Sequence, residues 1–571
     1  MLKKEYVVLL MAKFVLLSDN TLLYDYRDFP LLDFVPGAPG NSLPGFIYNF
    51  LKGKISPPLP DGRLKYAPYG LRKVEASLLK KYSSKDVVVV HPDYINSAIK
   101  DDTEVVAIHT MDPLGLGPTT MSYYVLFKSK DLNAYVKQEW EMLIAKVNAA
   151  RKGKKAKLLI GGPGVWEYTI MRDYVEKHNI DYLFQGEMDD YAPELFEQIS
   201  SGNIDETMFT RGFVTYDDNF MRSLKSDPKF IGRGKGIPTF PKLESIPAIV
   251  NPSTKGLTEA MRGCGIGCDF CEVTLRELRY YSPEKVAAEI KVNVANGGFD
   301  NAWLHSDEIF AYQHLKNYVP NEEALISLFT TVMSINGVRR SNPTHGRISI
   351  PSAFPELISK LSKILHASER NWIGIQVGLE TGSETLAKKH MPAKTLPLKI
   401  GVDGSWQEIV WNGVRNMNMN YWRPAFTVQI GQTSETEEDN WETVALINKL
   451  SNSVVDHRPF EFTVTPLYNM PLGRIKSKSF DVPLTQSMLA VYYASYRHLA
   501  KMAKRDAYKV MYNKNLALKY SVGSLISFGG GVMLKFVERI ARKYGVDIEK
   551  AKTYGVGIAK DIDSWSVAAH T

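Results

Sequence analysis

The cysteines are the residues of this chain with the clearest capacity for chemistry. There are three in 571 residues, at Cys264, Cys268 and Cys271. Three thiols cannot pair into a disulfide framework, but one short glycine-rich loop can bring them to three corners of an iron–sulfur cubane. Such clusters are normally held by four thiolates, so three would leave one iron open for a small ligand. A zinc site that lacks its fourth ligand, or three unrelated buried cysteines, are the alternatives.

The residues around the cysteines add a resemblance to a known family. They read Arg262-Gly-Cys-Gly-Ile-Gly-Cys-Asp-Phe-Cys-Glu-Val-Thr274. The CxxxCxxC spacing, with the aromatic Phe270 before the last cysteine, resembles the radical S-adenosylmethionine (SAM) superfamily. The resemblance implies a [4Fe–4S] cluster on the three cysteines and SAM on the open iron, beside Phe270. In that family the cluster cleaves SAM to a 5′-deoxyadenosyl radical.

Composition sets the broad class. With 44% hydrophobic and 23% charged residues the chain is typical of a soluble globular protein, too long for one core. The net charge of +8 is spread along the chain, so we expect no nucleic-acid partner. We find no apolar run near the roughly 18 residues that a membrane helix needs. We therefore predict no transmembrane segment and a cytoplasmic protein, peripheral to the membrane only if its substrate is a lipid.

The first part of the chain alternates short apolar runs with amphipathic segments. The predicted strands are 13–17, 87–90, 105–108, 158–160 and 182–184, and the predicted helices are 71–81 and 132–152. This alternation is typical of an α/β protein with a doubly wound parallel sheet. We assign 1–225 to this Rossmann-like domain and 226–256 to a linker. Ligands of such sheets bind beyond the carboxyl ends of the strands.

Three loops that follow predicted strand ends carry a second resemblance. The GGP sequence at 161–163, followed by Gly186-Glu187, is similar to loops of the cobalamin-binding domain fused to many radical SAM enzymes. A nucleotide-binding or vestigial flavodoxin-like domain is the alternative. The residues that the resemblance implies as cobalamin contacts are His109, Asp112, Leu114, Gly115, Gly161, Gly162, Pro163, Gly186 and Glu187.

The usual cobalt-ligating histidine is missing. Other members of that family carry it in a DxHxxG motif, which this chain does not contain. The resemblance therefore implies cobalamin without a histidine ligand, its lower face left to water or a nearby side chain. His109 could serve, although a histidine at a strand end is more often hydrogen-bonded to backbone.

A second alternation of strands and helices runs from 257 to 475. It resembles the partial (β/α)6 barrel of radical SAM enzymes. The predicted strands are 302–305, 347–350, 373–378, 426–430 and 462–466, with a helix at 283–295 that begins at a Ser-Pro cap. The remaining 476–571 is predicted as a mainly helical C-terminal domain, with helices around 489–509 and 533–544 and a hinge-like break at Gly529-Gly-Gly531.

Polar groups after the second barrel strand match a family position for SAM. There the family holds the amino group of SAM, so the resemblance implies this role for Ser306, Asp307 or Glu308. A helix N-cap explains Ser306 or Asp307 equally well. On the predicted strand 347–350, alternation points Arg347 into the barrel, where a guanidinium could fork onto SAM's carboxylate. An exterior salt bridge is the alternative.

The next two strands complete the expected SAM site. The segment Gly378-Leu-Glu-Thr-Gly-Ser383 resembles the family's GxESGS stretch, which implies Gln376, Glu380 and Ser383 near the ribose and methionine parts of SAM. The segment that begins at Val428 resembles the family's GxIxGxxxE strand. It implies Val428 and Ile430 as the apolar bed of the adenine, although a helix cap at Thr436 accounts for part of that pattern.

Together these resemblances point to a cobalamin-dependent radical SAM enzyme of archaeal type that acts on an unactivated carbon. They imply a C-methyltransferase of a protein residue or other large substrate, served by an external reductant for the cluster. The alternative is a ring synthase that forms C–C bonds in archaeal tetraether membrane lipids. A sensor without turnover is disfavoured by Glu380 and Ser383, and a methylthiotransferase by the lack of three further cysteines.

Overall fold

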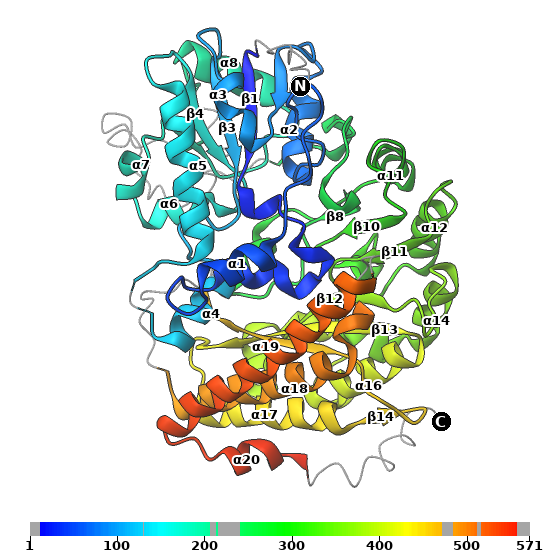
Figure 1. Ribbon diagram of the computed structural model, residues 1–571. Helices are drawn as coiled ribbons and strands as arrows, with labels where there is room; N and C mark the ends of the chain where they lie inside the picture. Colours follow the sequence, from blue (N-terminus) through cyan, green and yellow to red (C-terminus); the bar gives the residue numbers. More distant parts are fainter. Residues whose placement is uncertain are drawn as a thin grey trace. The chain divides into compact units, whose positions relative to one another are not determined.

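The computed structural model describes residues 12–129, 131–205, 213–214, 240–470, 484–510 and 516–556. The chain divides into two compact units (Figure 1). Unit 1 comprises Met1–Thr258 and Ala287–Phe299, and unit 2 comprises Glu259–Val286 and Asp300–Thr571. The barrel strands after the first and the C-terminal helices thus belong to one unit, whereas unit 1 takes up Leu257 and Thr258 of the first strand and a segment from between the first barrel strands.

Unit 1 is built on one sheet whose strand order is β2-β1-β3-β4-β5-β6. The strands are β1 (Phe14–Ser18), β2 (Val87–Val89), β3 (Val105–His109), β4 (Lys157–Gly161), β5 (Tyr182–Phe184) and β6 (Phe213–Val214). The first five are parallel, and β6 pairs antiparallel with β5. The order 2-1-3-4-5 is that of flavodoxin-like doubly wound sheets. The predicted α/β class with parallel strands is confirmed.

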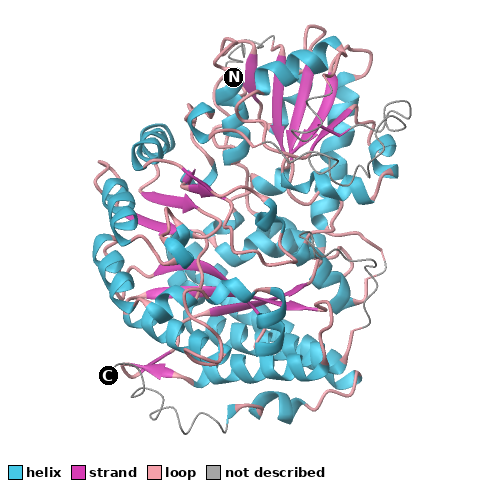
Figure 2. Ribbon diagram, turned by 180° about the vertical axis from the view of Figure 1, so that it is seen from behind, coloured by secondary structure: helices cyan, strands magenta, loops and turns pink. Residues whose placement is uncertain are grey.

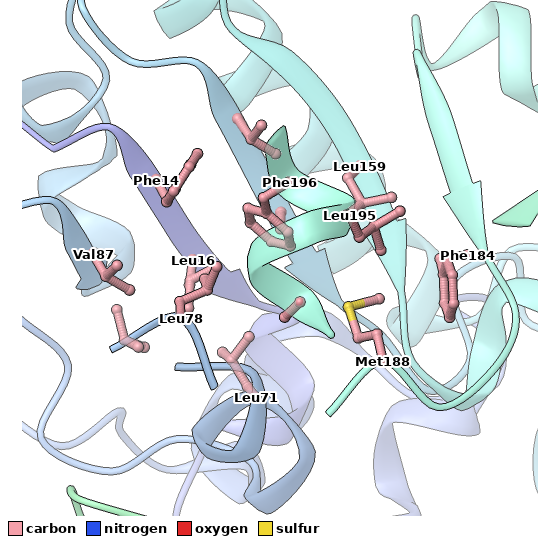
Figure 3. Packing of buried hydrophobic residues seen from close by; sticks show 14 of the residues in the cluster. Phe14, Leu16, Leu71, Leu78, Val87, Leu159, Phe184, Met188, Leu195 and Phe196 are labelled. Atoms are coloured by element: carbon pink, nitrogen blue, oxygen red, sulfur yellow. The ribbon is translucent and has the colours of Figure 1, made fainter. Parts of the chain in front are cut away.

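Helices of unit 1 flank this sheet, as Figure 2 shows. In chain order the helices of the unit are α1 (Gly45–Lys52), α2 (Tyr69–Leu78), α3 (Ile95–Ala98), α4 (Pro118–Phe127), α5 (Tyr135–Arg151), α6 (Trp166–Ile170), α7 (Asp173–Lys177) and α8 (Ala192–Ser201). The strands are continuous apolar runs because both faces of the sheet are covered. On one face, Leu71 and Leu78 of α2 and Phe196 of α8 pack against Phe14 and Leu16 of β1 (Figure 3).

A buried ion pair joins the inserted segment to α2 within unit 1. It links Lys73 to Glu289 of α11 (Pro283–Gly297), and both side chains are almost fully buried. Tyr69 donates a hydrogen bond of 2.6 Å to the same carboxylate. A buried charge is stable only when it is paired and hydrogen-bonded, so this carboxylate fixes α11 to α2.

Unit 2 contains two three-stranded sheets, ordered β11-β10-β7 and β12-β13-β16. The strands are β7 (Leu257–Glu259), β10 (Asn301–His305), β11 (Arg340–Pro343), β12 (Ile373–Glu380), β13 (Trp422–Ile430) and β16 (Thr463–Tyr468). A parallel bridge between His345 and Gln376 joins the end of β11 to β12. The six strands therefore follow one another in chain order, as the expected partial barrel requires. The short hairpins β8 (Met261–Arg262) with β9 (Arg279–Tyr280) and β14 (Val454–Val455) with β15 (Arg458–Pro459) lie outside these sheets.

Helices follow the strands of unit 2 along the chain. They are α12 (Glu322–Met333), α13 (Ser349–Ala353), α14 (Pro355–Ile364), α15 (Glu384–His390), α16 (Trp406–Met419), α17 (Glu437–Asn452), α18 (Gln486–Val510), α19 (Leu516–Lys543) and α20 (Ile548–Thr553). In α16 and α17 a capping box closes the N-terminus: Ser405 with Glu408, and Thr436 with Asp439.

Two sequence predictions are wrong. The segment 347–350 is not a strand: β11 lies earlier, and α13 begins at Ser349. The apolar Ile348 suggested a strand, but it packs against a helix. A Cβ built on Gly413 of α16 would lie 2.6 Å from the carbonyl oxygen of Ile348. The triplet at 529–531 is not a hinge, because α19 runs through it. A Cβ on Gly530 would lie 3.5 Å from Ala503, an ordinary contact, so this position faces α18.

One helix of the described residues has the length and apolar composition of a membrane span. It covers Lys519–Lys543 within α19, with a mean hydropathy of 1.3 over its most apolar window, of which 12% is buried. A single helix of this kind is weak evidence for a span, so the absence of a transmembrane segment stays a prediction.

Candidate functional site

The three cysteines lie on the loop that connects β8 and β9 in unit 2. Its base is fixed by backbone pairing of Met261 with Tyr280 and of Arg262 with Arg279. The backbone N–H of Gly263 donates a hydrogen bond of 2.7 Å to Asp307. The loop therefore leaves and re-enters the fold at a defined place.

A histidine holds the middle of the loop. His390, in the last turn of α15, lies 2.8 Å from Asp269 through Nδ1 and 2.8 Å from the carbonyl oxygen of Thr433 through Nε2. The backbone N–H of Asp269 donates to the carbonyl of His390 at 3.1 Å. The sequence analysis missed His390, because nothing in its own neighbourhood relates it to the cysteines.

The glycines between the cysteines give the loop its curvature. Gly263, Gly265 and Gly267 all have left-handed backbone, with φ of 75°, 68° and 86°. A Cβ on Gly263 would lie 2.6 Å from the carbonyl oxygen of Glu277, and one on Gly265 would collide with the hydroxyl of Tyr318. No atom of the described residues lies within 4 Å of a Cβ on Gly267. Two of the glycines are thus required by packing, and the third borders open space.

The three thiols interact electrostatically, and in the absence of a bound metal each of them is neutral at pH 7. Burial raises the pKa of Cys264 and of Cys268 to about 12 and raises the pKa of Cys271, and the thiols also oppose each other's ionisation. A bound metal reverses this preference, because it deprotonates a coordinating thiol. Among the described residues no group of three His, Cys, Asp or Glu side chains is arranged to hold a single metal ion. Three thiolates that each bind a different iron of one cluster do not have to meet at a single point.

A buried lysine supplies positive charge beside two of these thiols. Burial lowers the pKa of Lys394, but Glu380 and the thiols of Cys268 and Cys271 outweigh it, so its pKa lies above the usual value. The Lys394 ammonium donates to Glu380 Oε1 at 2.9 Å, and Gln429 donates to Oε2 at 2.9 Å. The three cysteines and this charge pair fit an anionic cluster with thiolate ligands.

The backbone at the end of β12 is shaped around this charge pair. Glu380 has a left-handed φ of 65° after a register shift in the strand. A Cβ on Gly378 would collide with the Glu380 carboxylate and lie 2.6 Å from the ammonium of Lys394. The sequence analysis named Glu380 but missed its partners, Lys394 and Gln429.

The residues after β10 differ in what they do. Ser306 is fully buried and bonds the backbone of His345, and Asp307 holds the cysteine loop. Glu308 is buried against Arg347, with 3.5 Å between Oε2 and Nε. Burial raises the pKa of Glu308, and Arg347 opposes that rise.

Arg347 is placed differently from either expectation. It lies in the turn before α13, almost fully buried, and donates to the carbonyl oxygens of Leu396 at 3.1 Å and Tyr318 at 3.3 Å. It forms a buried pair with Glu308 instead of an exterior salt bridge, and its other bonds join loops. Its predicted contact with SAM has no support in this geometry.

Three further predicted SAM residues have structural duties or the wrong orientation. Ser383 caps α15 and donates a hydrogen bond of 2.5 Å to Asp439. Val428 and Ile430 are fully buried on the face of β13 opposite to Gln429. Their side chains point away from the Glu380 pair, so the proposed apolar bed is not on the cysteine side. Gln376 is exposed on β12, and Phe270 lies half-buried in the cysteine loop.

A pair of histidines that the sequence analysis did not assign lies at the ends of β10 and β11. The rings of His305 and His345 are 6.2 Å apart and edge to face. Nδ1 of His345 lies 3.1 Å from the carbonyl oxygen of Ser306. Burial, and next the neighbouring His305, lower the pKa of His345. His345 is therefore a neutral imidazole near pH 7.

Unit 1 gathers the three loops of the predicted cobalamin site at one edge. His109 ends β3, Gly161 ends β4, and Gly186 with Glu187 follows β5, all at the carboxyl ends of parallel strands. The chain order reverses between β1 and β3, and this reversal is where such sheets bind ligands. The edge is therefore the ligand-binding edge that the fold predicts.

A buried aspartate that the sequence analysis missed lies at this reversal. Asp19 directly follows β1; its Oδ1 accepts from the backbone and hydroxyl of Thr21 at 3.0 Å, and its Oδ2 accepts from Thr110 at 3.3 Å. Burial raises the pKa of Asp19 to about 7. Its position after an apolar strand was visible in the sequence, but the strand order that makes it notable was not.

His109 is held between glycines. Its Nδ1 is buried and has no hydrogen-bond partner in the described part of the chain, and burial lowers its pKa to about 4. A Cβ on Gly162, whose φ is 98°, would lie 3.2 Å from the ring and 2.6 Å from the carbonyl oxygen of Thr110. Gly162 is therefore required by contacts inside the protein. The predicted contact of His109 with cobalamin stays a prediction.

The remaining predicted cobalamin residues shape the loop before α4. Asp112 accepts from the backbone of Gly117 at 2.8 Å and from Thr120 at 2.5 Å. Glu167 accepts from the backbone of Leu114 at 2.6 Å, and burial, with Asp112 beside it, raises the pKa of Glu167 far above its usual range.

The other predicted residues differ in exposure. Leu114 is fully buried and Gly115 has a left-handed φ of 74°, so these two residues offer a ligand only backbone. Pro163 is exposed where it begins a short helical turn after β4. The predicted contacts of all three with cobalamin stay predictions.

Comparison with known proteins gives remote structural similarities. Neither a protein-family model nor a curated protein matches the chain. The chain is similar to the radical SAM methyltransferase TsrM from Kitasatospora setae with cobalamin and a [4Fe–4S] cluster bound, at 15% identity over 80% of this chain and 72% of that chain, with a TM-score of 0.49. For the TsrM structure with tryptophan substrate and the SAM analogue aza-SAM bound, the identity is 14% over 80% of this chain and 73% of that chain, and the TM-score is 0.46.

The chain is also similar to the cobalamin-dependent SAM radical enzyme OxsB with aqua-cobalamin bound. The identity is 12%, the similarity covers 78% of this chain and 53% of that chain, and the TM-score is 0.44. At these identities the likeness concerns the course of the chain alone, and the substrates of those proteins are not transferred to this one.

Proposed function

We propose that this chain is a cobalamin-dependent radical SAM enzyme that methylates an unactivated carbon of a protein residue or another large substrate. The observation that carries the proposal is the loop of Cys264, Cys268 and Cys271. Its three thiols interact, its glycines have left-handed backbone, and one of them borders open space. These are the requirements of a loop that wraps three irons of a cluster and leaves the fourth accessible.

The residues of unit 2 have separate tasks in this proposal. Cys264, Cys268 and Cys271 would hold a [4Fe–4S] cluster, and the ammonium of Lys394 offsets part of its negative charge. Glu380 holds Lys394 in place at 2.9 Å. When bound, the cluster supplies an electron for the reductive cleavage of SAM, and cobalamin supplies a methyl group. Neutral His345 would hold the end of β10, where Asp307 bonds the cysteine loop.

In unit 1 the proposal places cobalamin at the carboxyl edge of the sheet. The backbone of the loops after β3, β4 and β5 would contact it, while Asp112 and Glu167 hold the first loop in shape. His109 would contribute a buried, neutral imidazole to this edge, because burial lowers its pKa to about 4.

A second candidate is supported by α19. Leu525, Phe528 and Val532 are 38–70% exposed along one face of that helix, and Leu516 and Tyr520 are exposed in the turns before it. A face of this kind suits a lipid substrate, so a ring synthase that joins carbons of archaeal tetraether membrane lipids is the alternative. Ring closure and methylation both act on unactivated carbon and differ in whether a methyl group is transferred.

The deciding experiment is anaerobic reconstitution with iron, sulfide, methylcobalamin, a low-potential reductant and SAM that carries a deuterated methyl group. Incubation with a protein extract or a lipid extract should give deoxyadenosine and S-adenosylhomocysteine in about equal amounts, and a labelled product. Deoxyadenosine with an unlabelled lipid product would replace the methyltransferase by the ring synthase. A protein that forms no deoxyadenosine and holds no cluster would refute both.

A further inference from the structure

Helix α19 of unit 2 packs against the protein through one face, and its other face is exposed. Helix α19 packs along α18, and α18 in turn packs on α17 and β16. Val537 and Ala541 of α19 are fully buried, and Gly530 lies next to Ala500 and Ala503 of α18. Figure 1 shows α19 lying across its neighbours as a separate layer. Exposed side chains, among them Leu525, Phe528 and Val532, line its outer face.

The first half of this outer face is apolar. Leu525, Phe528 and Val532 follow one another at steps of three and four positions, which places them on one stripe of the helix. We call these three residues the α19 stripe; their exposed fractions are 38, 70 and 50%. The other exposed positions before Val532 are, among the described side chains, Leu516, Ala517, Tyr520, Ser521, Ser524 and Gly529, none of them charged. The stripe extends for about two turns, roughly 10 Å at the usual helical rise.

The second half of the same face is cationic. Lys535, Arg539, Arg542 and Lys543 are all exposed, and Glu538 pairs with Arg542 at 2.7 Å. Lys535, Arg539 and Lys543 have no acidic partner among the described residues. An apolar face that passes into a cluster of lysine and arginine is the pattern of helices that lie in a membrane interface.

We propose that α19 docks the protein onto a bilayer surface that contains anionic lipid. The α19 stripe enters the boundary between headgroups and acyl chains, and Lys535, Arg539 and Lys543 contact lipid phosphates. Charge complementarity selects this occupant: an anionic surface matches unpaired cations, whereas lysine is depleted in protein interfaces. The inference holds whichever reaction the protein catalyses.

The geometry makes α19 lie on the bilayer instead of crossing it. The face that carries Gly530 and Val537 is occupied by α18 and cannot meet lipid. In addition, Lys535, Glu538 and Arg539 put three charged side chains into the second half of the helix, where a membrane span would place apolar ones. Binding should therefore be reversible and sensitive to salt, because each lysine or arginine near an anionic surface gains attraction that added salt screens.

The test is flotation of the full chain with vesicles of phosphatidylcholine, with and without phosphatidylglycerol. The wild type should float with anionic vesicles and be released by high salt. The F528S/V532S double variant should bind at least about tenfold more weakly, because each residue buries apolar area in the interface. The K535E/R539E variant should lose the preference for anionic lipid, by about fivefold per charge.

Matched controls use equally exposed residues elsewhere. Phe46 of α1 and Val402 are 76 and 77% exposed, so F46S and V402S should leave binding unchanged. Thermal unfolding reports whether each variant is folded. Equal binding of wild type and F528S/V532S would overturn the proposal, as would resistance to salt extraction. A dimer that F528S/V532S converts to monomer, without vesicle binding, would assign the stripe to a second copy of the chain.

Discussion

The cysteine loop of unit 2 and the sheet edge of unit 1 both combine glycines with titratable side chains, but they use them differently. In the loop, the thiols are buried, oppose each other's ionisation and lie near the ammonium of Lys394, which favours their thiolate forms. At the edge, Asp19 and Asp112 are already satisfied by backbone and hydroxyl donors. The comparison separates side chains kept for a ligand from side chains that build the loops around one.

The largest effect is expected for the thiols. Replacing Cys264, Cys268 and Cys271 together by alanine should abolish the cluster, because no other cysteine exists to substitute. Iron should fall from about four per chain to background, and deoxyadenosine formation should stop. Iron analysis and absorbance of the reconstituted protein measure this. A folded triple variant that keeps its iron would show that the loop is no ligand set.

The buried ammonium beside the thiols comes next. Lys394→Met leaves Glu380 as an unpaired buried charge, which should cost about 3–5 kcal/mol of unfolding free energy. It should also make the reconstituted cluster harder to reduce, because a nearby positive charge is lost.

The matched control for that variant is Lys388→Met. This lysine is 52% exposed in its pair with Glu384, and an exposed pair contributes about 0–1 kcal/mol. Urea unfolding and redox titration are the measurements. Equal effects of the two variants would contradict a special place for Lys394.

The third prediction concerns Asp19 of unit 1. Its pKa of about 7 in the folded chain exceeds the ordinary value near 4. Between these values the folded chain holds a proton that the unfolded chain releases, so this group lowers stability as pH rises through the window. The free-energy difference between wild type and Asp19→Asn should change by about 1.4 kcal/mol per pH unit between pH 4.5 and 6.5. A pH-independent difference would mean that Asp19 is ionised in the fold.

The smallest effect separates two glycines of the cysteine loop. Gly263→Ala meets both a left-handed φ and a carbonyl oxygen at 2.6 Å, and Gly267→Ala meets a left-handed φ alone. Left-handed backbone costs roughly 1–2 kcal/mol for alanine, so both variants should be destabilised and Gly263→Ala by more. Unfolding of the apoprotein gives this order. If Gly267→Ala then also fails to take up iron, the open space beside it belongs to the cluster.

The features that could be predicted from the sequence are those determined by residues adjacent in the chain. The strand at 182–184 was placed correctly because an apolar run is bounded by polar residues, and α11 was found from its Ser-Pro start. The cysteine loop was located from spacing alone. These features need only neighbouring residues for their recognition.

The parts that were missed depend on contacts between distant segments. Lys394 and His390 follow β12 in the chain and lie near the cysteine loop in the fold, but no sequence motif relates them to the cysteines. Arg347 was placed on a strand because Ile348 and Ile350 alternate, although both pack as part of a helical turn. Val428 and Ile430 matched a motif, but their register turned them to the opposite face. The types of residue in a site can be predicted from the sequence more readily than the directions in which their side chains point.

The contribution of α11 to unit 1 has a consequence for any attempt to divide the gene. A fragment that ends at Thr258 would omit Ala287–Phe299, and with it the carboxylate of Glu289 that accompanies Lys73 and Tyr69. The excised half would carry a buried ammonium without its counter-ion. Insertions, deletions and domain exchanges in related genes should accordingly respect both segments, so that unit 1 is inherited as two pieces of sequence that cannot be separated.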